Sequence, residues 1–197
     1  MVSELVPILK KKYPETSIEL LEGNLVPTEQ LLAEKKIDLA FVAINSLQNI
    51  PGSGEVLGSE EILFAVPQQH PSSRALEGVS SLTADLLSQY FGSDDFILPR
   101  KDSTVNHAIQ DFLKLCHINF EAVCNVNHMT TISNMVANKV GVSFIPSTCQ
   151  QPHLPIRYFS LSPKIFRLSA IIYRNDRPLT NAENYLLELA RNYKLFH

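Results

Sequence analysis

The sequence has few cysteines, no dense cluster of basic residues and no long apolar run, and each absence excludes a class of protein. Its three cysteines, an odd number without close pairing, fit a reducing compartment better than a disulfide framework. Seventeen basic residues stand against twenty acidic ones, and the only basic run is Lys10, Lys11 and Lys12. The chain therefore offers no electrostatic surface for gripping phosphates, and we expect no nucleic-acid binding by this chain itself.

Apolar stretches such as Leu39–Ile44 are far too short to cross a bilayer. The N-terminus lacks the order of basic, apolar and small residues that marks a secretory signal. We therefore expect a cytoplasmic protein that does not engage membranes.

Local motifs of enzymes and metal sites are also missing from the sequence. It contains no G-x-S-x-G elbow, no phosphate-binding glycine loop, no H-E-x-x-H and no C-x-x-C, and its six histidines show no metal-ligand spacing. We therefore predict neither an enzyme nor a metal or other cofactor. A catalytic group assembled from distant residues stays open as a third alternative, which turnover of a bound ligand would favour.

What the chain does contain is an alternation of strand-like and helix-like segments. Strands are predicted at 17–21, 37–44, 62–66, 96–98, 122–126, 141–146 and 168–173, and helices at 3–12, 81–90, 104–116, 130–138 and 180–193, with another opening at Thr28. This order predicts an α/β fold with mostly parallel sheets and flanking helices.

Two polar tracts without helical pattern, around residues 45–60 and 149–164, suggest two lobes in place of one. If the chain crosses between lobes at both tracts, residues 1–60 and 164–197 form lobe I and residues 61–163 form lobe II. A hinged binding cleft would then lie between the two lobes.

Four phrases in order carry a resemblance to a known family. They are Tyr13-Pro14 with Ile18–Gly23, Lys36–Phe41, Val66-Pro67 with His70-Pro71, and Met135–Pro146. In this order and spacing the chain resembles the effector-binding domain of LysR-type transcription regulators, a two-lobed, periplasmic-binding-protein-like (type 2) fold. Some members of that family carry an arginine where this chain has Ala43 and Ile44, and such an arginine would clamp a carboxylate.

The resemblance implies a ligand-sensing regulatory domain that binds a small polar or anionic effector and thereby modulates DNA binding by the intact regulator. DNA would be bound only through a helix-turn-helix, which precedes this domain in the family and is not in this sequence. The resemblance also implies a homodimer or higher homo-oligomer, in which the helix at 3–12 meets the helix at 130–138 of its mate. The alternative is a solute-binding protein of a transport system, which shares the fold.

The strongest candidate site opens the helix at 104. Asp102, Ser103 and Thr104 follow a strand and a short loop, so their polar groups and the free N–H groups of the helix would face the cleft with the positive end of the helix dipole. That arrangement suits an anion, although an ordinary helix cap has the same residues.

Further candidates follow from similar reasoning, and each has an ordinary structural explanation beside it. His128, Thr130 and Thr131 start the next helix and could line the same cleft, or could be an exposed cap. Asn24 stands in a turn that, by the resemblance, faces the ligand from lobe I, and Ser3 stands near the position of the family's first helix cap. Ser147 follows the strand that ends at Pro146. Cys116 and Cys124 are predicted to be small core residues.

Overall fold

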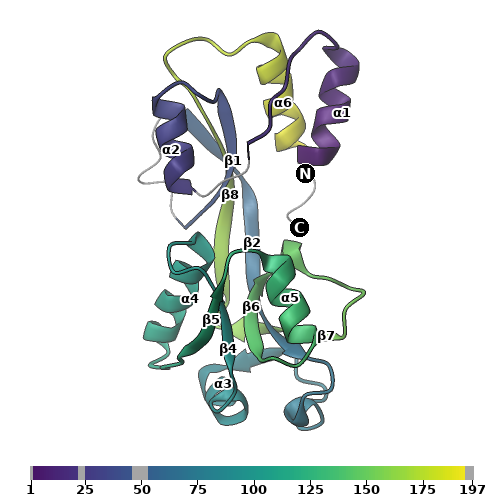
Figure 1. Cartoon of the computed structure of the whole chain (residues 1–197), viewed down its shortest axis with the longest axis vertical. Coiled ribbons are helices and arrows are strands. Elements are labelled where there is room, and N and C mark those ends of the chain that lie inside the picture. The colour runs from purple at the N-terminus through teal and green to yellow at the C-terminus, as the bar shows by residue number, and fades with distance from the viewer. Residues whose placement is uncertain (1, 22–24, 46–52, 194–197) are drawn as a thin grey trace. The chain divides into compact units, whose positions relative to one another are not determined.

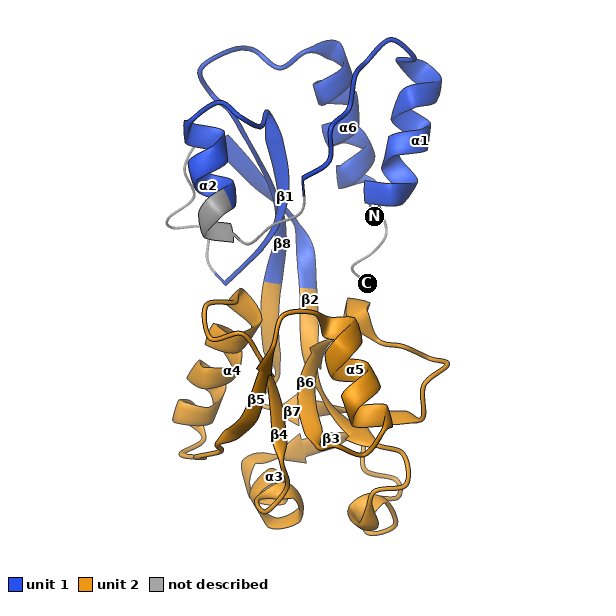
Figure 2. Cartoon of the chain, viewed as in Figure 1, with its two compact units in different colours: residues 1–59, 168–197 blue, residues 60–167 orange. Residues whose placement is uncertain are grey.

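The computed structural model describes residues 2–21, 25–45 and 53–193. The chain divides into two compact units, unit 1 of residues 1–59 and 168–197 and unit 2 of residues 60–167 (Figure 2). Two strands contribute residues to both units, β2 (Ser53–Pro67) and β8 (Ile165–Tyr173). Both points at which the chain passes from one unit to the other therefore fall within strands.

Unit 1 contains β1 (Leu39–Ile44), most of β8, the first residues of β2 and several helices. The helices are α1 (Val2–Lys12), α2 (Leu25–Ala33) and α6 (Asn181–Arg191), and β1 pairs antiparallel with β8 (Figure 1). The apolar face of α1 buries Leu5 and Leu9. The rings of Tyr13 and Tyr185 lie 5.9 Å apart between α1 and α6. The helices predicted near both ends of the chain are confirmed.

The segment 17–21 is not the strand that its alternating pattern predicts. Leu20 and Leu21 are 61% and 58% exposed. A strand needs a neighbour to take up its backbone N–H and C=O groups. Within the described ranges no strand pairs with 17–21, so the alternating pattern alone does not make it a strand.

Unit 2 contains a mixed sheet, whereas mostly parallel strands were predicted. Its elements are β3 (Ser81–Thr83), α3 (Ala84–Phe91), β4 (Phe96–Pro99), α4 (Thr104–Leu115), β5 (Ala122–Val126), α5 (Met129–Ala137), β6 (Val142–Pro146) and β7 (Ile156–Ser162), with short 3-10 turns at Pro71–Ser73 and Ser147–Cys149. Strand β4 lies parallel to both β5 and β6, while β2 runs antiparallel to β6 and β7. Strands β4, β5 and β6 run parallel and are joined by the crossover helices α4 and α5, and β3 also lies parallel to β7. Strand β2 enters from unit 1 and runs opposite to β6 and β7.

Alternation along the strands of unit 2 sends side chains into two cores, one on each face of the sheet. Phe96 and Leu98 of β4 join one cluster, with Phe64, Phe91 and Phe144 and the buried faces of α3 and α4. Ile97 points the other way into a smaller cluster with Ile132 and Val136 of α5. This two-sided burial explains why the short strands read as continuous apolar runs in the sequence.

Strand β2 is much longer than the predicted segment 62–66, because its glycine and serine residues were interpreted as a loop. A Cβ added to Gly54 would lie 2.9 Å from Ile172 Cγ2 and 3.0 Å from the Ile171 carbonyl oxygen. Gly54 therefore marks a close approach between neighbouring strands and not a turn.

The segment after β2 is anchored to β7 by one arginine. The Arg157 guanidinium donates to the carbonyl oxygens of Ser73, Leu76 and Val79 at 2.6–3.2 Å and lies 4.4 Å from the ring centre of Phe159. One side chain thus satisfies three carbonyl groups of an irregular segment, which fixes the path of the chain between β2 and β3.

Candidate functional site

The carboxyl ends of β4, β5 and β6 meet at one edge of unit 2. These parallel neighbours end at Pro99, Val126 and Pro146, and the Arg100 N–H donates to the Val126 carbonyl oxygen at 3.1 Å. Ser103, His128 and Ser147 each follow one of these strands. Ligands of open α/β sheets bind at this edge, because the loops and helix N-termini gather there.

Ser103 is the N-cap of α4. Its Oγ accepts from the Asn106 N–H at 3.1 Å, and its own hydroxyl proton has no acceptor within the described ranges. Asn106 is 3% exposed and donates through its side chain to the Pro99 carbonyl oxygen at 2.7 Å, which fixes the turn between β4 and α4. The turn that carries Ser103 and Thr104 is therefore fixed by the buried side chain of Asn106.

Asp102 forms an ion pair with the nearby Arg100. The Arg100 guanidinium donates to both carboxylate oxygens, at 2.8 and 2.5 Å, and these hydrogen bonds lower the pKa of Asp102 and raise that of Arg100. Both side chains are about half exposed. The pair largely cancels the negative charge that Asp102 would otherwise place before the helix N-terminus.

The start of α5 is polar and open to solvent. His128 is its N-cap residue by backbone position, but its side chain makes no capping hydrogen bond. His128, Thr130 and Thr131 are all exposed. Ser147 is half-buried at the start of the 3-10 turn after β6. These four residues thus lie at or beside the edge that carries Ser103.

Two of the candidates, Ser3 and Asn24, come from the first lobe. Ser3 lies inside α1, which begins at Val2, and it is exposed, so it is not the N-cap residue that was expected. Asn24 lies outside the described residues. Thr28, expected to cap the second helix, lies inside α2.

Sequence reasoning missed a buried polar group at the same edge, formed by Glu60, Arg167 and Thr148. Glu60 is 4% exposed, and its two carboxylate oxygens accept from Arg167 Nε and from Thr148 Oγ1. Glu60 stands two residues before Ile62, which pairs with Pro146 at the end of β6. The sequence pattern could have revealed Glu60, because residues two apart in a strand lie on the same face and Ile62 is buried.

Cys149 adjoins this group. Its Sγ lies 4.0 Å from Thr148 Oγ1, and burial raises the pKa of its thiol, an effect that the positive charge of Arg167 opposes. Cys116 and Cys124, like Cys149, are half-buried free thiols. A raised pKa makes a thiol a poor nucleophile at neutral pH.

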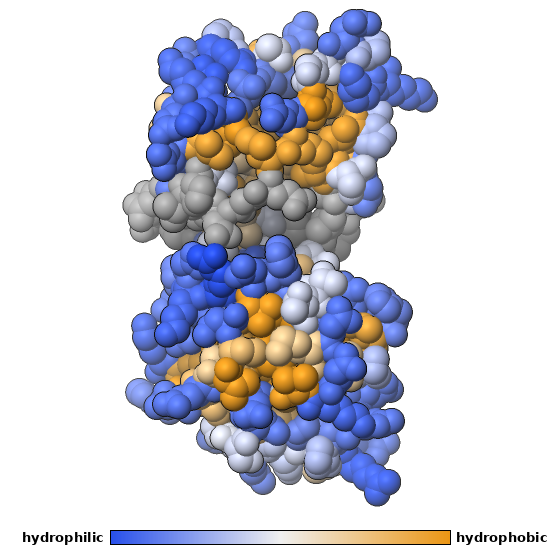
Figure 3. All heavy atoms as spheres, in the orientation of Figure 1, coloured by the Kyte–Doolittle hydropathy of each residue, from blue (hydrophilic) through white to orange (hydrophobic). Residues whose placement is uncertain are grey.

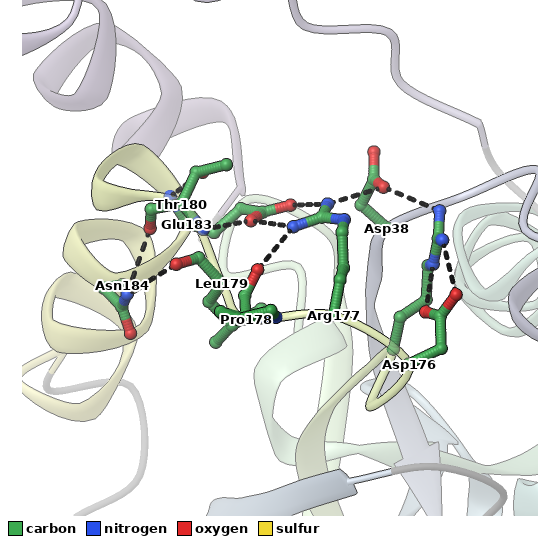
Figure 4. A network of polar contacts seen from close by, with 9 residues as sticks. Asp38, Asp176, Arg177, Pro178, Leu179, Thr180, Glu183 and Asn184 are labelled. Carbon is green, nitrogen blue, oxygen red and sulfur yellow. Dashed lines mark hydrogen bonds and ion pairs between the residues drawn. The ribbon is translucent and has the colours of Figure 1, made fainter.

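In unit 1 the charged groups near β1 and α6 are bound to one another (Figure 4). Arg177 bridges Asp38 and Glu183, with Nη2–Oδ1 and Nη1–Oε2 distances of 2.8 Å, and Arg174 holds Asp176 at 2.9 Å. Hydrogen bonds from Arg177 lower the pKa of Glu183 to about 2. These contacts join the start of β1 to the capping box of α6, so we assign them to stability.

A family model described as the LysR substrate binding domain matches residues 1–194. This chain belongs to the LysR substrate-binding domain family. It is 21% identical over 199 residues to the uncharacterized HTH-type transcriptional regulator YcgK of Bacillus subtilis (strain 168), and the match covers 94% of this chain. The chain spans 61% of the length of that curated relative.

Solved structures agree with the fold. The CcmR regulatory domain of Synechocystis PCC6803 in complex with 2-PG matches with a TM-score of 0.79 at 14% identity, covering 96% of this chain and 89% of that one. The effector-binding domain of QuiR in complex with shikimate matches with a TM-score of 0.76 at 20% identity, covering 100% and 92%. The predicted periplasmic-binding-protein-like α/β fold is confirmed.

Several other features of this LysR substrate-binding domain bear on its chemistry. Where some family members carry an arginine, Ala43 and Ile44 pair with β8, and Ile44 is 2% exposed.

Among the described residues, no group of three or more His, Cys, Asp or Glu side chains is placed to hold a metal ion. No helix in the described part of the chain is long and apolar enough to cross a membrane.

Proposed function

We propose that this domain senses a small polar or anionic metabolite, which it binds at the carboxyl edge of β4, β5 and β6. The observation that carries the proposal is the N-terminus of α4, presented by the fixed turn of Ser103 and Asn106 at the edge where α/β sheets bind ligands. Asp102, Thr104, His128, Thr130, Thr131 and Ser147 are the proposed further contacts from this unit, and Ser3 and Asn24 those from unit 1.

Arg167 adds a second source of positive charge at this edge. Its side chain is 14% exposed, and its Nε is bound by Glu60. Within the described residues, its terminal amino groups have no hydrogen-bond acceptor. Two parallel N–H groups of a guanidinium match a carboxylate or phosphate. We therefore propose Arg167 as the residue that selects an anionic effector.

The proposed response is a shift between arrangements of two lobes, with residues 1–60 and 164–197 in lobe I and 61–163 in lobe II. A ligand moves such an equilibrium only through its different affinity for the two states. The location of the effector in a cleft between the lobes remains a prediction.

In the longer regulator, binding would alter how a DNA-binding module outside this chain engages its target. We propose that the domain acts as a homodimer or higher homo-oligomer in the cytoplasm, without catalysis. Figure 3 shows apolar residues gathered at the surface of each unit, and Ile8 of α1 is 45% exposed, which supports self-association. The relative is an HTH-type transcriptional regulator, and the two structural neighbours are a regulatory domain and an effector-binding domain, which favours this function over solute transport.

The test is a thermal-shift screen of the domain against central metabolites, amino acids, aromatic acids, 2-PG and shikimate. A compound at one hundred times its Kd stabilises by about 2.7 kcal/mol, which raises the Tm of a domain of this size by about 5–10 °C. We expect the Ser103→Ala/Thr104→Ala variant to lose this shift, and Arg167→Gln to reduce it.

Thr83→Ala is the matched control, because Thr83 caps α3 in the same unit. Its Oγ1 accepts a hydrogen bond from the Leu86 N–H. Loss of either cap costs about 1 kcal/mol of stability. Only the change at α4 should abolish the response to ligand. If no compound stabilises the parent domain, or if the α4 variant responds as the control does, the proposed site is wrong.

A further inference from the structure

A polar cavity lies in unit 2, at the edge of the sheet opposite to the proposed effector site. It has a volume of about 330 Å³, and its walls come from the segment after β2, the turn before β4 and the turn before β6. The last two walls are joined, because the Val142 N–H donates to the Asp95 carbonyl oxygen at 2.9 Å. The volume is at the lower end of the range for small-molecule sites.

Two of the lining residues, Asp95 and Gly141, make a close backbone contact. A Cβ added to Gly141 would lie 2.1 Å from the Asp95 carbonyl oxygen, so only glycine permits this approach. Lys139, which follows the C-cap residue of α5, adopts a φ of 63°, and this left-handed conformation ends the helix before β6. The two walls that Asp95 and Gly141 belong to are therefore held together by the backbone.

His70 and Asp94 form a hydrogen-bonded pair in the wall. His70 Nδ1 accepts from the Ser72 N–H at 3.2 Å, so its Nε2–H is free to donate to Asp94 Oδ1 at 3.1 Å. The other carboxylate oxygen, Asp94 Oδ2, is buried and has no hydrogen-bond partner among the described residues. A buried carboxylate oxygen without a donor is costly, and a donor brought to it is favoured.

Charges of both signs remain unpaired around the same cavity. Lys139 Nζ donates to the neutral Gln69 side chain at 2.8 Å, and within the described ranges it has no carboxylate partner. Asp95 is exposed and likewise forms no ion pair with any described residue. An unpaired ammonium and an unpaired carboxylate thus line one cavity without neutralising each other.

We propose that this cavity binds a small zwitterion, such as a free amino acid, as a second ligand site independent of the effector site. The ligand's ammonium group lies toward Asp94 and Asp95, and its carboxylate lies toward Lys139 and Gln69. Opposite charges on one ligand match the two unpaired charges of the wall, whereas a simple anion or cation matches only one. For a ligand of this size we expect a Kd of about 1 mM.

The experiment is a titration of the ¹⁵N-labelled domain followed by amide NMR shifts. The probes are L-alanine and 4-aminobutanoate as zwitterions with different charge spacing, and ethylamine and acetate as single charges. We expect a saturable shift of the amides of 68–71, 93–95 and 139–142 with at least one zwitterion. Asp94→Asn, which keeps the acceptor for His70, and Lys139→Gln should each weaken binding at least about tenfold.

Asp85→Asn on α3 and Lys114→Gln on α4 are matched controls, since both side chains are exposed away from the cavity walls. They should leave binding unchanged. The proposal is overturned if neither zwitterion gives a saturable shift up to about 50 mM, well above the expected Kd. It is also overturned if acetate or ethylamine binds equally well, or if Asp94→Asn and Lys139→Gln bind as the parent does.

Discussion

Glu60→Ala should destabilise unit 2 far more than the same change at the adjacent Glu61. Glu60 has a side chain 3% exposed and holds Arg167, whose side chain is 14% exposed, so removing the carboxylate leaves a nearly buried guanidinium without a partner. Breaking such a buried pair costs about 3–5 kcal/mol, and the residual exposure of Arg167 places the expected loss at about 3 kcal/mol. Glu61 binds Lys164, whose side chain is 54% exposed, and the buried Oε1 of Glu61 has no hydrogen-bond partner in the described part of the chain. We expect Glu61→Ala to cost less than about 1 kcal/mol.

The assay is urea denaturation followed by circular dichroism, because the chain has no tryptophan to report by fluorescence. A double variant, Glu60→Ala/Arg167→Met, also removes the unpaired positive charge of Arg167 and should be more stable than Glu60→Ala alone. Equal losses in Glu60→Ala and Glu61→Ala, or a double variant less stable than Glu60→Ala, would refute the assignment of a buried ion pair.

Three further predictions concern stability elsewhere in the fold. Glu183 has its pKa lowered to about 2 from 4.5 by Arg177, so its contribution is complete above pH 4.5 and is lost as the pH falls toward 2. Glu183→Gln should therefore cost about 1–2 kcal/mol at pH 7, after allowance for solvent screening, and the difference from the parent in urea titrations should shrink between pH 4.5 and 3. Arg157→Ala should cost about 2–3 kcal/mol by stranding three carbonyl groups, and limited proteolysis should then cut between β2 and β3, whereas unchanged resistance would contradict the anchoring role. Gly141→Ala should cost at least about 2 kcal/mol because its Cβ meets the Asp95 carbonyl oxygen, and a Tm equal to that of the parent would show that this contact relaxes freely.

Much of the fold could be predicted because burial in this chain follows the strand and helix periods. In the segment Gly141–Pro146 the sequence predicts a strand, and β6 alternates between the two cores, with Phe144 on one side and Ile145 on the other. The segment 17–21 alternates as regularly but has no partner strand among the described residues. A local sequence pattern does not show which distant strand a segment will pair with. For this reason the prediction of a strand was right for 141–146 and wrong for 17–21.

The candidate site was predictable to the extent that it depends on local chemistry. The cap that Ser103 makes on α4 could be predicted, because a hydroxyl residue just before an amphipathic run is a local signal for a helix start. The contact of Glu60 with Arg167 joins residues 107 positions apart, and no local signal pairs them. That Ser103 contacts an effector is still a prediction, because a cap and a ligand site use the same groups.

The position of Arg167 in the chain gives the proposed sensor a physical route for its signal. Arg167 is the last residue of unit 2 on β8, and Leu168 is the first residue of unit 1 on the same strand. Glu60 has the corresponding position on β2, where Ser59 precedes it in unit 1. An effector anion bound to the terminal amino groups of Arg167 would compete with Glu60 for the positive charge. The energy of the ion pair would then change at the two points where the chain passes between units, so Glu60→Gln should alter the ligand response as well as stability.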